Sequence, residues 1–556
     1  MDDACPGAGR GEGAVQVRES ERTGEYPAPG AQDAKPESDE AHSAFTPPLG
    51  VPLPPPPEPE GSAFAPPSGA SATAPAPPPA FTPPEGIPVV RLARDAPWQD
   101  RMRAMLRMPV AERPAPETAE KAEAEGPPVP RILDLTLRIG ELLLAGGEGA
   151  EDVEAAMFGV AHAYGLDRVE PTVTFTLLSI TYQPSLVEDP VSASRTVRRR
   201  GTDYTRLAAV YRLIDDITAH EATLEDAYRA LAEIRRNRHP YPGWLLTLAA
   251  GVLAGAASML VGGGPTVFAA AAVGAMLGDR LAWLCAGRGL PEFYQFVSAA
   301  MPAAALGVLI TLFGHHLPGG GHVKSSAVIT GGLYALIPGR ALVAGVQDGL
   351  TGFYITASAR LLEVLYLIIG IVFGVSMVLY VGVTVGAQLH PEEALGAFHD
   401  PPVQLLAAMV LTLAFAVLLQ CERGVLPVVT LNGGVAWVTY GSLTQQGRLN
   451  AIAATAVAAG LVGLFGQLLS RYRYASALPY VTAAIGPLLP GSATYFGLLA
   501  FTQGRQVQGV ASLAKAVALA LAVAIGVNLG GEIARMVIRV PLGAGPRRAA
   551  KRTRGF

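Results

Sequence analysis

The chain has little charge for its length, and most of that charge lies near its two ends. Only 16% of the 556 residues are charged, which is low for a soluble protein of this size. The formal net charge of −4, without a basic stripe that carries interleaved aromatic residues, argues against a nucleic-acid partner. Half of the residues are apolar, and long apolar runs fill the region between residues 240 and 530. This distribution predicts a membrane protein.

Cysteines and nucleotide-binding motifs are scarce as well. Cys5, Cys285 and Cys421 are too few and too scattered for a disulfide framework or a zinc site. The Gly-Gly-Gly-Pro run at 262–265 lacks the lysine of a phosphate-binding loop, and no Walker sequence occurs, which argues against an ATP-driven pump. The N-terminus lacks the pattern of a signal peptide, so we expect the first crossing helix to direct membrane insertion.

Proline, by contrast, is abundant at the start of the chain. Residues 1–87 are rich in Pro, Ala, Gly and Glu and have little apolar periodicity, so we predict a disordered tail. A polyproline ligand for a partner protein is the alternative. In the linker 88–130, apolar residues recur at helical spacing opposite arginines: Trp98, Met102, Met105 and Leu106 against Arg101, Arg103 and Arg107. Such a basic amphipathic helix could lie on a membrane surface or dock on the folded domain that follows.

Residues 131–240 are predicted to form a cytoplasmic α+β domain. An apolar stripe predicts one helix that ends at Gly146-Gly147, and a second helix follows it. The stretch 169–182 is rich in Val, Thr, Phe and Ile, which is typical of strands. Residues 203–236 return to a helical pattern.

Apolar segments follow one another from Trp244 onward. Each is close to the length of about 20 residues that crosses the hydrocarbon of a bilayer, the seventh being marginal. The predicted crossings are residues 244–261, 266–286, 296–313, 325–350, 361–385, 403–420, 425–441, 450–470, 477–502 and 510–531. The predicted fold is therefore a polytopic α-helical membrane protein with about ten transmembrane helices. Because five is an odd number, two repeats of five helices, at 241–390 and 400–540, must be inverted relative to each other.

The fourth and ninth crossings resemble each other in sequence. At one constant offset, four pairs of identical residues match: Thr330 with Thr482, Leu336 with Leu488, Pro338 with Pro490, and Gly339 with Gly491. Each Pro-Gly pair should split its helix, because proline removes a backbone donor and clashes with the preceding turn. Interrupted apolar segments at matching places in two halves point to a transporter's binding site. The second half-helices, from Arg340 and Ser492, would offer free N–H groups to a carboxylate. A proline kink that only bends a packed helix is the alternative.

The distribution of arginine and lysine predicts that both termini are cytoplasmic. Basic residues precede the first crossing and fill the tail 541–556. The predicted inner loops carry Arg280, Arg288, Arg360, Arg423, Arg471 and Arg473, whereas the outer loops hold only Lys324, Arg448 and Arg505. This pattern satisfies the positive-inside rule.

Ionisable residues within crossings are costly and therefore indicate function. Asp348 follows the first break, and its repeat counterpart is Ala500, so the architecture does not require the acid. Glu363 and Lys515 occupy equivalent positions with opposite charge and could pair or line the path of a zwitterion. Alternatively, Asp348 and Glu363 lie at the cytoplasmic interface, solvated or paired with Arg360. Two asparagines inside crossings, Asn432 and Asn528, either bind substrate or form interhelix hydrogen bonds.

Three stretches resemble the threonine/serine exporter family. Residues 138–147, followed by Gly149-Ala150 and Asp152-Val153, are similar to the opening of that family's cytoplasmic domain. Residues 337–340 (Ile-Pro-Gly-Arg), with Asp348, Arg360 and Glu363, resemble its first membrane half, and residues 489–492 (Leu-Pro-Gly-Ser) resemble its second. The likeness covers residues 131–540. It implies export of L-threonine and L-serine across the plasma membrane, energised by the proton motive force rather than by ATP.

Together, these features predict a secondary transporter with alternating access, whose partners are a small amino acid, protons and the lipid bilayer. No cofactor and no metal are expected. The predicted substrate-binding residues are Pro338, Gly339, Arg340, Asp348, Pro490, Gly491, Ser492, Thr330 and Thr482. The candidates for coupling or ion pairing are Asp348, Glu363, Lys515 and Arg360, where Asp348 or Glu363 would receive the ammonium group or the proton. The sequence leaves the oligomeric state open.

Two other classes of function remain as alternatives. A membrane-anchored hydrolase would use residues 131–238 as its catalyst, because Glu148, Glu151, Asp152 and His162 cluster near a helix start. Acids at a helix N-terminus are, however, stabilised by the helix dipole and need no catalytic role. The third class is a channel or scaffold.

Overall fold

The structure is a computed structural model, and it describes residues 98–106, 129–185, 187–198, 201, 203–236, 241–314, 324–387, 401–473 and 475–537. All of these residues belong to one compact unit, residues 83–556. The predicted disordered tail 1–87 and the basic tail 541–556 lie outside the described residues.

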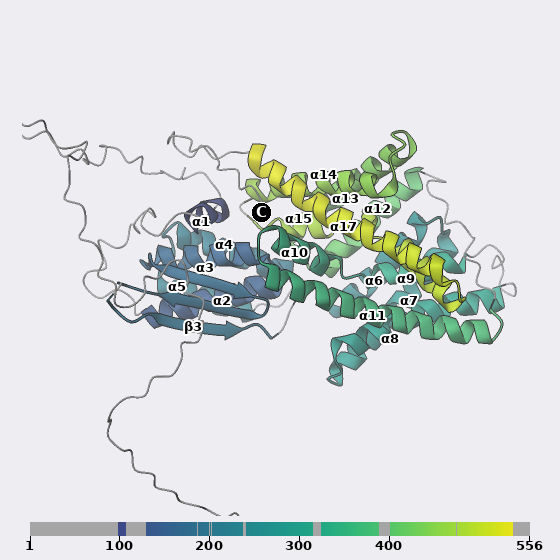
Figure 1. The fold of residues 1–556 in the computed structure, drawn as a ribbon, viewed down its shortest axis with the longest axis horizontal. Helices are drawn as coiled ribbons and strands as arrows, with labels where there is room; N and C mark the ends of the chain where they lie inside the picture. Colours follow the sequence, from purple (N-terminus) through teal and green to yellow (C-terminus); the bar gives the residue numbers. More distant parts are fainter. Residues whose placement is uncertain are drawn as a thin grey trace, which may run out of the picture. The chain divides into compact units, whose positions relative to one another are not determined.

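The N-terminal module, which we define as residues 129–236, packs helices on one face of a small sheet (Figure 1). Its elements are α2 (Val129–Gly146), α3 (Ala150–Ala163), β1 (Val169–Thr174), β2 (Leu177–Tyr182), β3 (Val191–Thr196), α4 (Tyr204–Thr218) and α5 (Leu224–Arg236). The strands pair antiparallel in the order β1-β2-β3, with Val169 opposite Tyr182 and Leu177 opposite Thr196. Burial alternates along β1, because one face of the sheet contacts the helices.

The predicted strand stretch 169–182 is therefore a hairpin of two strands. The third strand, β3, was not predicted from the sequence. Its residues are mostly exposed and include Ser192, Ser194 and Arg195, so it lacks the apolar alternation that marks a half-buried strand.

The predicted amphipathic helix is present as α1 (Trp98–Leu106), and it docks on the N-terminal module. Its buried apolar side chains are Trp98, Met102 and Met105. The ring of Trp98 lies 5.3 Å from that of Tyr211 on α4, and Arg103 pairs with Asp152 on α3. The sequence left open whether this helix lies on a membrane surface or docks on the folded domain, and in the structure it docks on the module.

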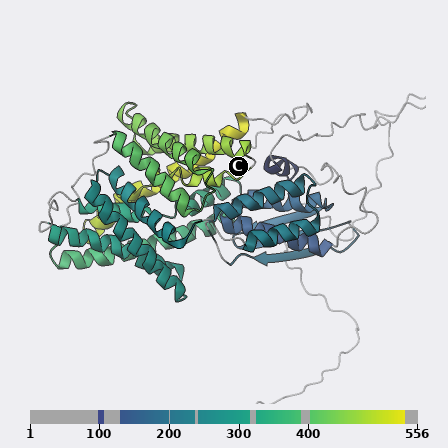
Figure 2. The same ribbon diagram turned by 180° about the vertical axis from the view of Figure 1, so that it is seen from behind.

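From Gly243 onward the described chain is a helical bundle, seen from behind in Figure 2. Its elements are α6 (Gly243–Leu260), α7 (Pro265–Gly287), α8 (Glu292–Phe313), α9 (Ser325–Tyr334), α10 (Gly339–Leu350), α11 (Tyr354–Thr384), α12 (Pro401–Leu418), α13 (Leu426–Gln445), α14 (Ala451–Tyr472), α15 (Leu478–Thr482), the 3-10 turn η5 (Gly486–Leu488), α16 (Gly491–Thr502) and α17 (Gln506–Val537). Every predicted crossing overlaps at least one of these helices.

Within the described residues, seven helices are long and apolar enough to cross a membrane, which identifies a multi-pass membrane protein. The number is eight if α9 and α10, which are bent by 52°, count as one span. The other two predicted crossings fall short. The seventh, α13, carries several polar residues, and the ninth is divided into α15, η5 and α16. The ten-helix inverted topology therefore remains a prediction.

Glycines allow the long helices α11 and α17 to pack closely on α8 and α14. A Cβ atom on Gly374 would meet the carbonyl oxygen of Val297, and one on Gly526 would meet that of Ala456. Small residues permit such backbone contact between apolar helices. Because Gly374 and Gly526 are at matching positions of the two apolar halves, both halves use the same contact.

Candidate functional site

Both predicted helix breaks are present, and they have nearly the same backbone geometry. Helix α10 begins after Pro338 (φ −78°, ψ 54°), and α16 begins after Pro490 (φ −82°, ψ 48°). In each break the glycine N–H donates to the carbonyl two residues earlier: Gly339 to Ile337 at 2.8 Å, and Gly491 to Leu489 at 2.9 Å. The next amides of each helix have no intrahelical partner, as at any helix N-terminus. Each break thus supplies donors for an acceptor.

The two breaks also contact each other, and we call this contact the junction. A Cβ atom on Gly339 would lie 3.0 Å from Cδ2 of Leu489, and the ring of Tyr334 lies against Gly491. Pro490 and both glycines are buried, whereas Pro338 and Ser492 are half-buried. Four predicted site residues, Pro338, Gly339, Pro490 and Gly491, are therefore brought together.

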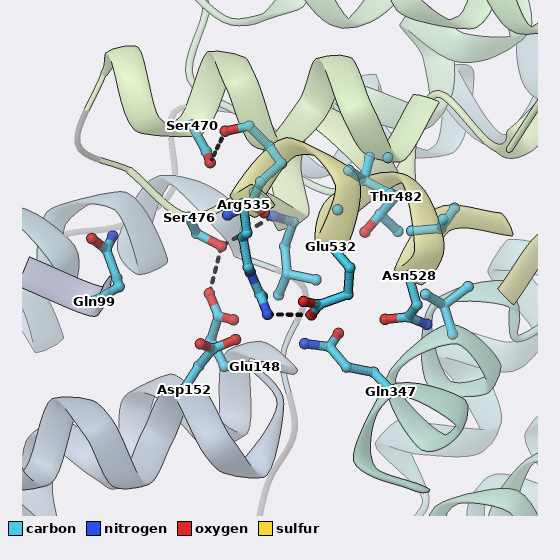
Figure 3. Close-up of a pocket in the computed structure, with 18 of the residues that line it drawn as sticks. Gln99, Glu148, Asp152, Gln347, Ser470, Ser476, Thr482, Asn528, Glu532 and Arg535 are labelled. Atoms are coloured by element: carbon cyan, nitrogen blue, oxygen red, sulfur yellow. Dashed lines mark hydrogen bonds and ion pairs between the residues drawn. The ribbon is translucent and has the colours of Figure 1, made fainter. Parts of the chain in front are cut away.

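A cavity of about 400 Å³ lies between α1, α10, α14, α15, α17 and the N-terminal module. Of the predicted site residues, Arg340 and Thr482 line it. Figure 3 shows Gln347, Asn528 and Thr482 on one side of this cavity and Gln99, Glu148 and Asp152 on the other. Its charged residues have both signs: Arg103, Glu148, Asp152, Arg340, Arg471, Glu532 and Arg535. The apolar part includes Val343, Val481, Ile485, Ile525 and Val527. This size and mixture suit a small zwitterionic ligand.

Asp348 lies where α10 meets the N-terminal module. Its Oδ2 atom is 2.9 Å from Nη1 of Arg360 on α11, and its Oδ1 atom accepts the backbone N–H of Ala150 at 2.8 Å. Asp348 is 0% exposed and Arg360 is 4% exposed. The structure thus contains the Asp348–Arg360 pair that the sequence left open as one alternative. Both carboxylate oxygens contact groups of the protein.

The loop between α2 and α3, which we call loop 146–150, contacts both broken segments. Arg340 donates from Nη1 to the Gly146 carbonyl at 2.9 Å, and Arg360 donates from Nη2 to the Glu148 carbonyl at 2.8 Å. The Glu148 carboxylate accepts the hydroxyl of Tyr211 at 2.7 Å and that of Ser476 at 2.5 Å. Ser476 in turn accepts the N–H of Leu478 at the start of α15.

The side chain of Glu148 is buried, and its burial raises the pKa of the carboxyl above its ordinary value. The hydrogen bonds from Ser476 and Tyr211 oppose this rise, as do the charges of Arg103 and Arg360. Burial disfavours a charged carboxylate, whereas donors and nearby cations favour it.

Sequence reasoning singled out Glu148 but did not predict its contacts, and it missed Ser476. The sequence feature that could have indicated these contacts is an acid between two glycines, Gly147 and Gly149. Gly147 has φ +93°, and a side chain there would also meet the Arg340 guanidinium. A Cβ atom on Gly149 would lie 3.1 Å from Nε2 of Gln347. These glycines allow the loop backbone to approach α10.

The remaining predicted residues are more dispersed. Thr330 is buried on α9, Glu363 is half-buried on α11, and Lys515 is exposed on α17. Asn432 donates to the carbonyls of Val462 and Tyr480, which is the interhelix role that the sequence allowed. Asn528 donates within its own helix, to Ala524, and lines the cavity.

Two family models match the chain. One, “Putative threonine/serine exporter”, covers residues 134–382, and the other, “Threonine/Serine exporter, ThrE”, covers residues 404–532. A “Probable threonine/serine exporter” of Mycobacterium tuberculosis is 32% identical over 412 residues, which are 72% of this chain and 76% of that protein. The chain belongs to the threonine/serine exporter family. A “Threonine/serine exporter” of Corynebacterium glutamicum is 30% identical over 444 residues, 76% of this chain and 89% of that protein. No solved structure matches the chain.

As a member of the threonine/serine exporter family, the protein is a transporter rather than an enzyme, so the hydrolase alternative is not retained. Three of the four residues that prompted this alternative make contacts within the protein. Asp152 pairs with Arg103, Glu148 accepts Tyr211 and Ser476, and His162 stacks on Phe158 at 5.5 Å. The first family model spans the N-terminal module and α6 to α11 together, in agreement with the contacts between loop 146–150 and helices α10 and α11.

Proposed function

We propose that this exporter is a secondary active transporter that moves L-threonine and L-serine across the plasma membrane and uses the proton motive force. One observation carries the proposal: two Pro-Gly breaks from matching positions of the apolar halves contact each other, and Arg340 and Thr482 of the broken segments line a cavity. Discontinuous helices at the interface of two repeats are typical of substrate sites in secondary transporters. The names of the two relatives support threonine and serine as substrates.

We place the substrate in the cavity. Its volume of about 400 Å³ is near the lower end of the range for small-molecule pockets, which suits a small amino acid. Arg340, at the start of α10, would hold the carboxylate. Thr482, Gln347 and Asn528 would bind the ammonium and hydroxyl groups. In this proposal, Pro338, Gly339, Pro490, Gly491 and Ser492 form the hinge, with Thr330 beside it on α9.

The positive-inside distribution of arginine and lysine supports a cytoplasmic location for the N-terminal module. The cavity would then face the cytoplasm, with the module covering it. Movement of the two halves about the junction would expose the cavity to the opposite side, which is alternating access. A proton moving down its gradient would drive the amino acid outward.

The proposal is tested with the full chain reconstituted in liposomes. We expect saturable counterflow of labelled threonine, inhibition by unlabelled serine, and net transport that increases when a pH gradient is imposed. Non-saturable flux would indicate a channel instead, and no flux in any condition would refute transport of these amino acids.

Two asparagine variants test the location of the site. Asn528→Ala removes an amide that lines the cavity and should raise the KM for threonine about tenfold, the loss expected for about one hydrogen bond. Asn450→Ala is the matched control, because Asn450 does not line the cavity and caps the start of α14 by accepting the N–H of Ala453. It should leave the KM unchanged. If both variants had the same KM as the unaltered protein, the substrate would bind outside this cavity.

A further inference from the structure

Glu148 connects the N-terminal module directly to the second broken segment. Its carboxylate accepts one hydroxyl from the module itself, on Tyr211, and one from Ser476, which precedes α15. Ser476 is 3% exposed, and its oxygen also caps α15 by accepting the N–H of Leu478. A change at the carboxylate therefore reaches the segment that leads to the Pro490 break.

Glu148 also lines the cavity, at the side formed by the module (Figure 3). The titratable and charged groups around it come from seven helices: Arg103 on α1, Asp152 on α3, Tyr211 on α4, Arg340 and Asp348 on α10, Arg360 on α11, Arg471 on α14, and Glu532 and Arg535 on α17 lie around the cavity or next to the carboxylate, whereas α15 contributes no charged group. Most of the acids in this set have a basic partner: Asp152 with Arg103, Asp348 with Arg360, and Glu532 with Arg535. The side chain of Glu148 is held by hydroxyl groups instead.

We propose that Glu148 is the gating residue of the exporter: the ionised carboxylate holds the N-terminal module closed over the cavity, and protonation of this carboxylate releases Ser476 and opens it. This inference rests on the proposed function, because a gate needs a transported substrate. Protonation adds one proton to a carboxylate oxygen, and deprotonation returns it to solvent, so no other reactant is required.

The chemistry of the contact explains why a proton would open it. An ionised carboxylate is purely an acceptor, and hydrogen bonds to an ionised group are roughly twice as strong as those between neutral groups. The hydroxyls of Tyr211 and Ser476 both donate to the same carboxylate oxygen, Oε1. Protonation removes the negative charge of the carboxylate, so both hydrogen bonds become weaker. Because burial raises the pKa of Glu148, this change occurs at a higher pH than for an exposed glutamate.

The gate is tested by the pH dependence of counterflow in liposomes that hold the full chain, with equal pH on both sides. For the unaltered protein we expect the rate to rise as the pH falls through a single titration step. Glu148→Gln mimics the protonated side chain, so its counterflow should persist, remain saturable and lose that step. Glu148→Gln counterflow that retains the step at the original midpoint would overturn the gate.

Glu154→Gln is the matched control. Glu154 lies on α3, the helix that follows loop 146–150, and burial raises the pKa of Glu154 to about 7. Its carboxylate, however, accepts the backbone N–H of Val173 within the module. We expect Glu154→Gln to keep the titration step. If Glu154→Gln lost the step and Glu148→Gln kept it, the titrating group would be Glu154 and not Glu148. This result would overturn the proposal.

Ser476→Ala provides a second, independent measurement in case Glu148→Gln does not fold. It leaves Glu148 in place but removes the hydroxyl that the ionised carboxylate holds, so counterflow should be high at every pH and the titration step should be lost. A step that remains at the original midpoint overturns the gate. Unaltered protein without counterflow at any pH would refute the proposed function itself, whereas normal counterflow with unmoved midpoints refutes only the gate.

Discussion

The two broken segments have nearly the same backbone conformation but differ in charge. Helices α10 and α16 each have 12 residues, and they lead into helices of 31 and 32 residues, α11 and α17. Three charged positions of the first half have uncharged counterparts in the second: Arg340 with Ser492, Asp348 with Ala500, and Arg360 with Ser512. The architecture of a broken segment therefore does not depend on these charges.

The difference shows where the N-terminal module docks. All three charged residues of the first half bond to the backbone of loop 146–150, whereas the second half contacts the loop through the Ser476 hydroxyl. A buried ion pair contributes little net stability, because its desolvation cost offsets its attraction, but the loss of one partner is strongly destabilising. The charges thus fix the position of loop 146–150 on the first half. Helix α4 joins the module to the second half separately, through the Tyr204–Thr482 hydroxyl contact, bonds to the carbonyls of Leu419 and Gln420, and the Arg212–Glu422 pair.

The largest effect is expected from breaking the Asp348–Arg360 pair. Asp348→Asn leaves Arg360 buried without its counter-charge, which should cost about 3–5 kcal/mol of stability. Transport should fall at least tenfold at temperatures where the variant remains folded. The measurements are thermal unfolding of the purified chain and threonine counterflow.

The double variant Asp348→Asn/Arg360→Gln is the control for this prediction. Because it removes both charges, it should be less destabilised than the sum of the two single variants. Additive losses would show that the two side chains act independently, and the charge of the first half would then need another explanation.

The second prediction compares the two glycines of the junction. A methyl group on Gly491 would meet the buried ring of Tyr334, whereas one on Gly339 would meet the end of the flexible Leu489 side chain at 3.0 Å. Overpacking typically costs about 1–3 kcal/mol. We therefore expect Gly491→Ala to lower counterflow about tenfold and Gly339→Ala to lower it less.

Removal of the ring provides the control. Tyr334→Leu combined with Gly491→Ala should recover much of the activity that Gly491→Ala loses. Equal losses for the two glycine variants, or no recovery in the combined variant, would mean that the two sides of the junction are not packed differently.

These residues also show how far the sequence leads. The helices and both breaks could be predicted, because apolar runs and Pro-Gly pairs act through local physical rules. The partners of the buried charges could not. Ala150 and Asp348 are 198 residues apart, and Glu148 and Ser476 are 328 apart, so their contacts depend on how the module docks. The sequence therefore identified Asp348 as unusual but could not decide between an ion pair and a substrate contact.

The smallest effect on transport is expected from a substitution of Glu154, whose carboxylate accepts the backbone N–H of Val173 within the module. Burial raises its pKa from 4.5 to about 7, although the N–H of Val173 opposes this rise. The folded module therefore binds more protons than the unfolded chain between these two values, and stability is lost as the pH rises through about 7. Glu154→Gln cannot ionise, so it should be more stable than the unaltered protein at pH 8 by up to roughly 3 kcal/mol, and equally stable below pH 4.5.

Hydrogen exchange of the β1 amides at the two pH values measures this difference. We expect slower exchange in the variant than in the unaltered protein at pH 8, equal exchange below pH 4.5, and an unchanged transport rate. This result would show that Glu154 titrates inside the module and takes no part in joining the module to the bundle. Equal exchange at pH 8 would contradict the raised pKa.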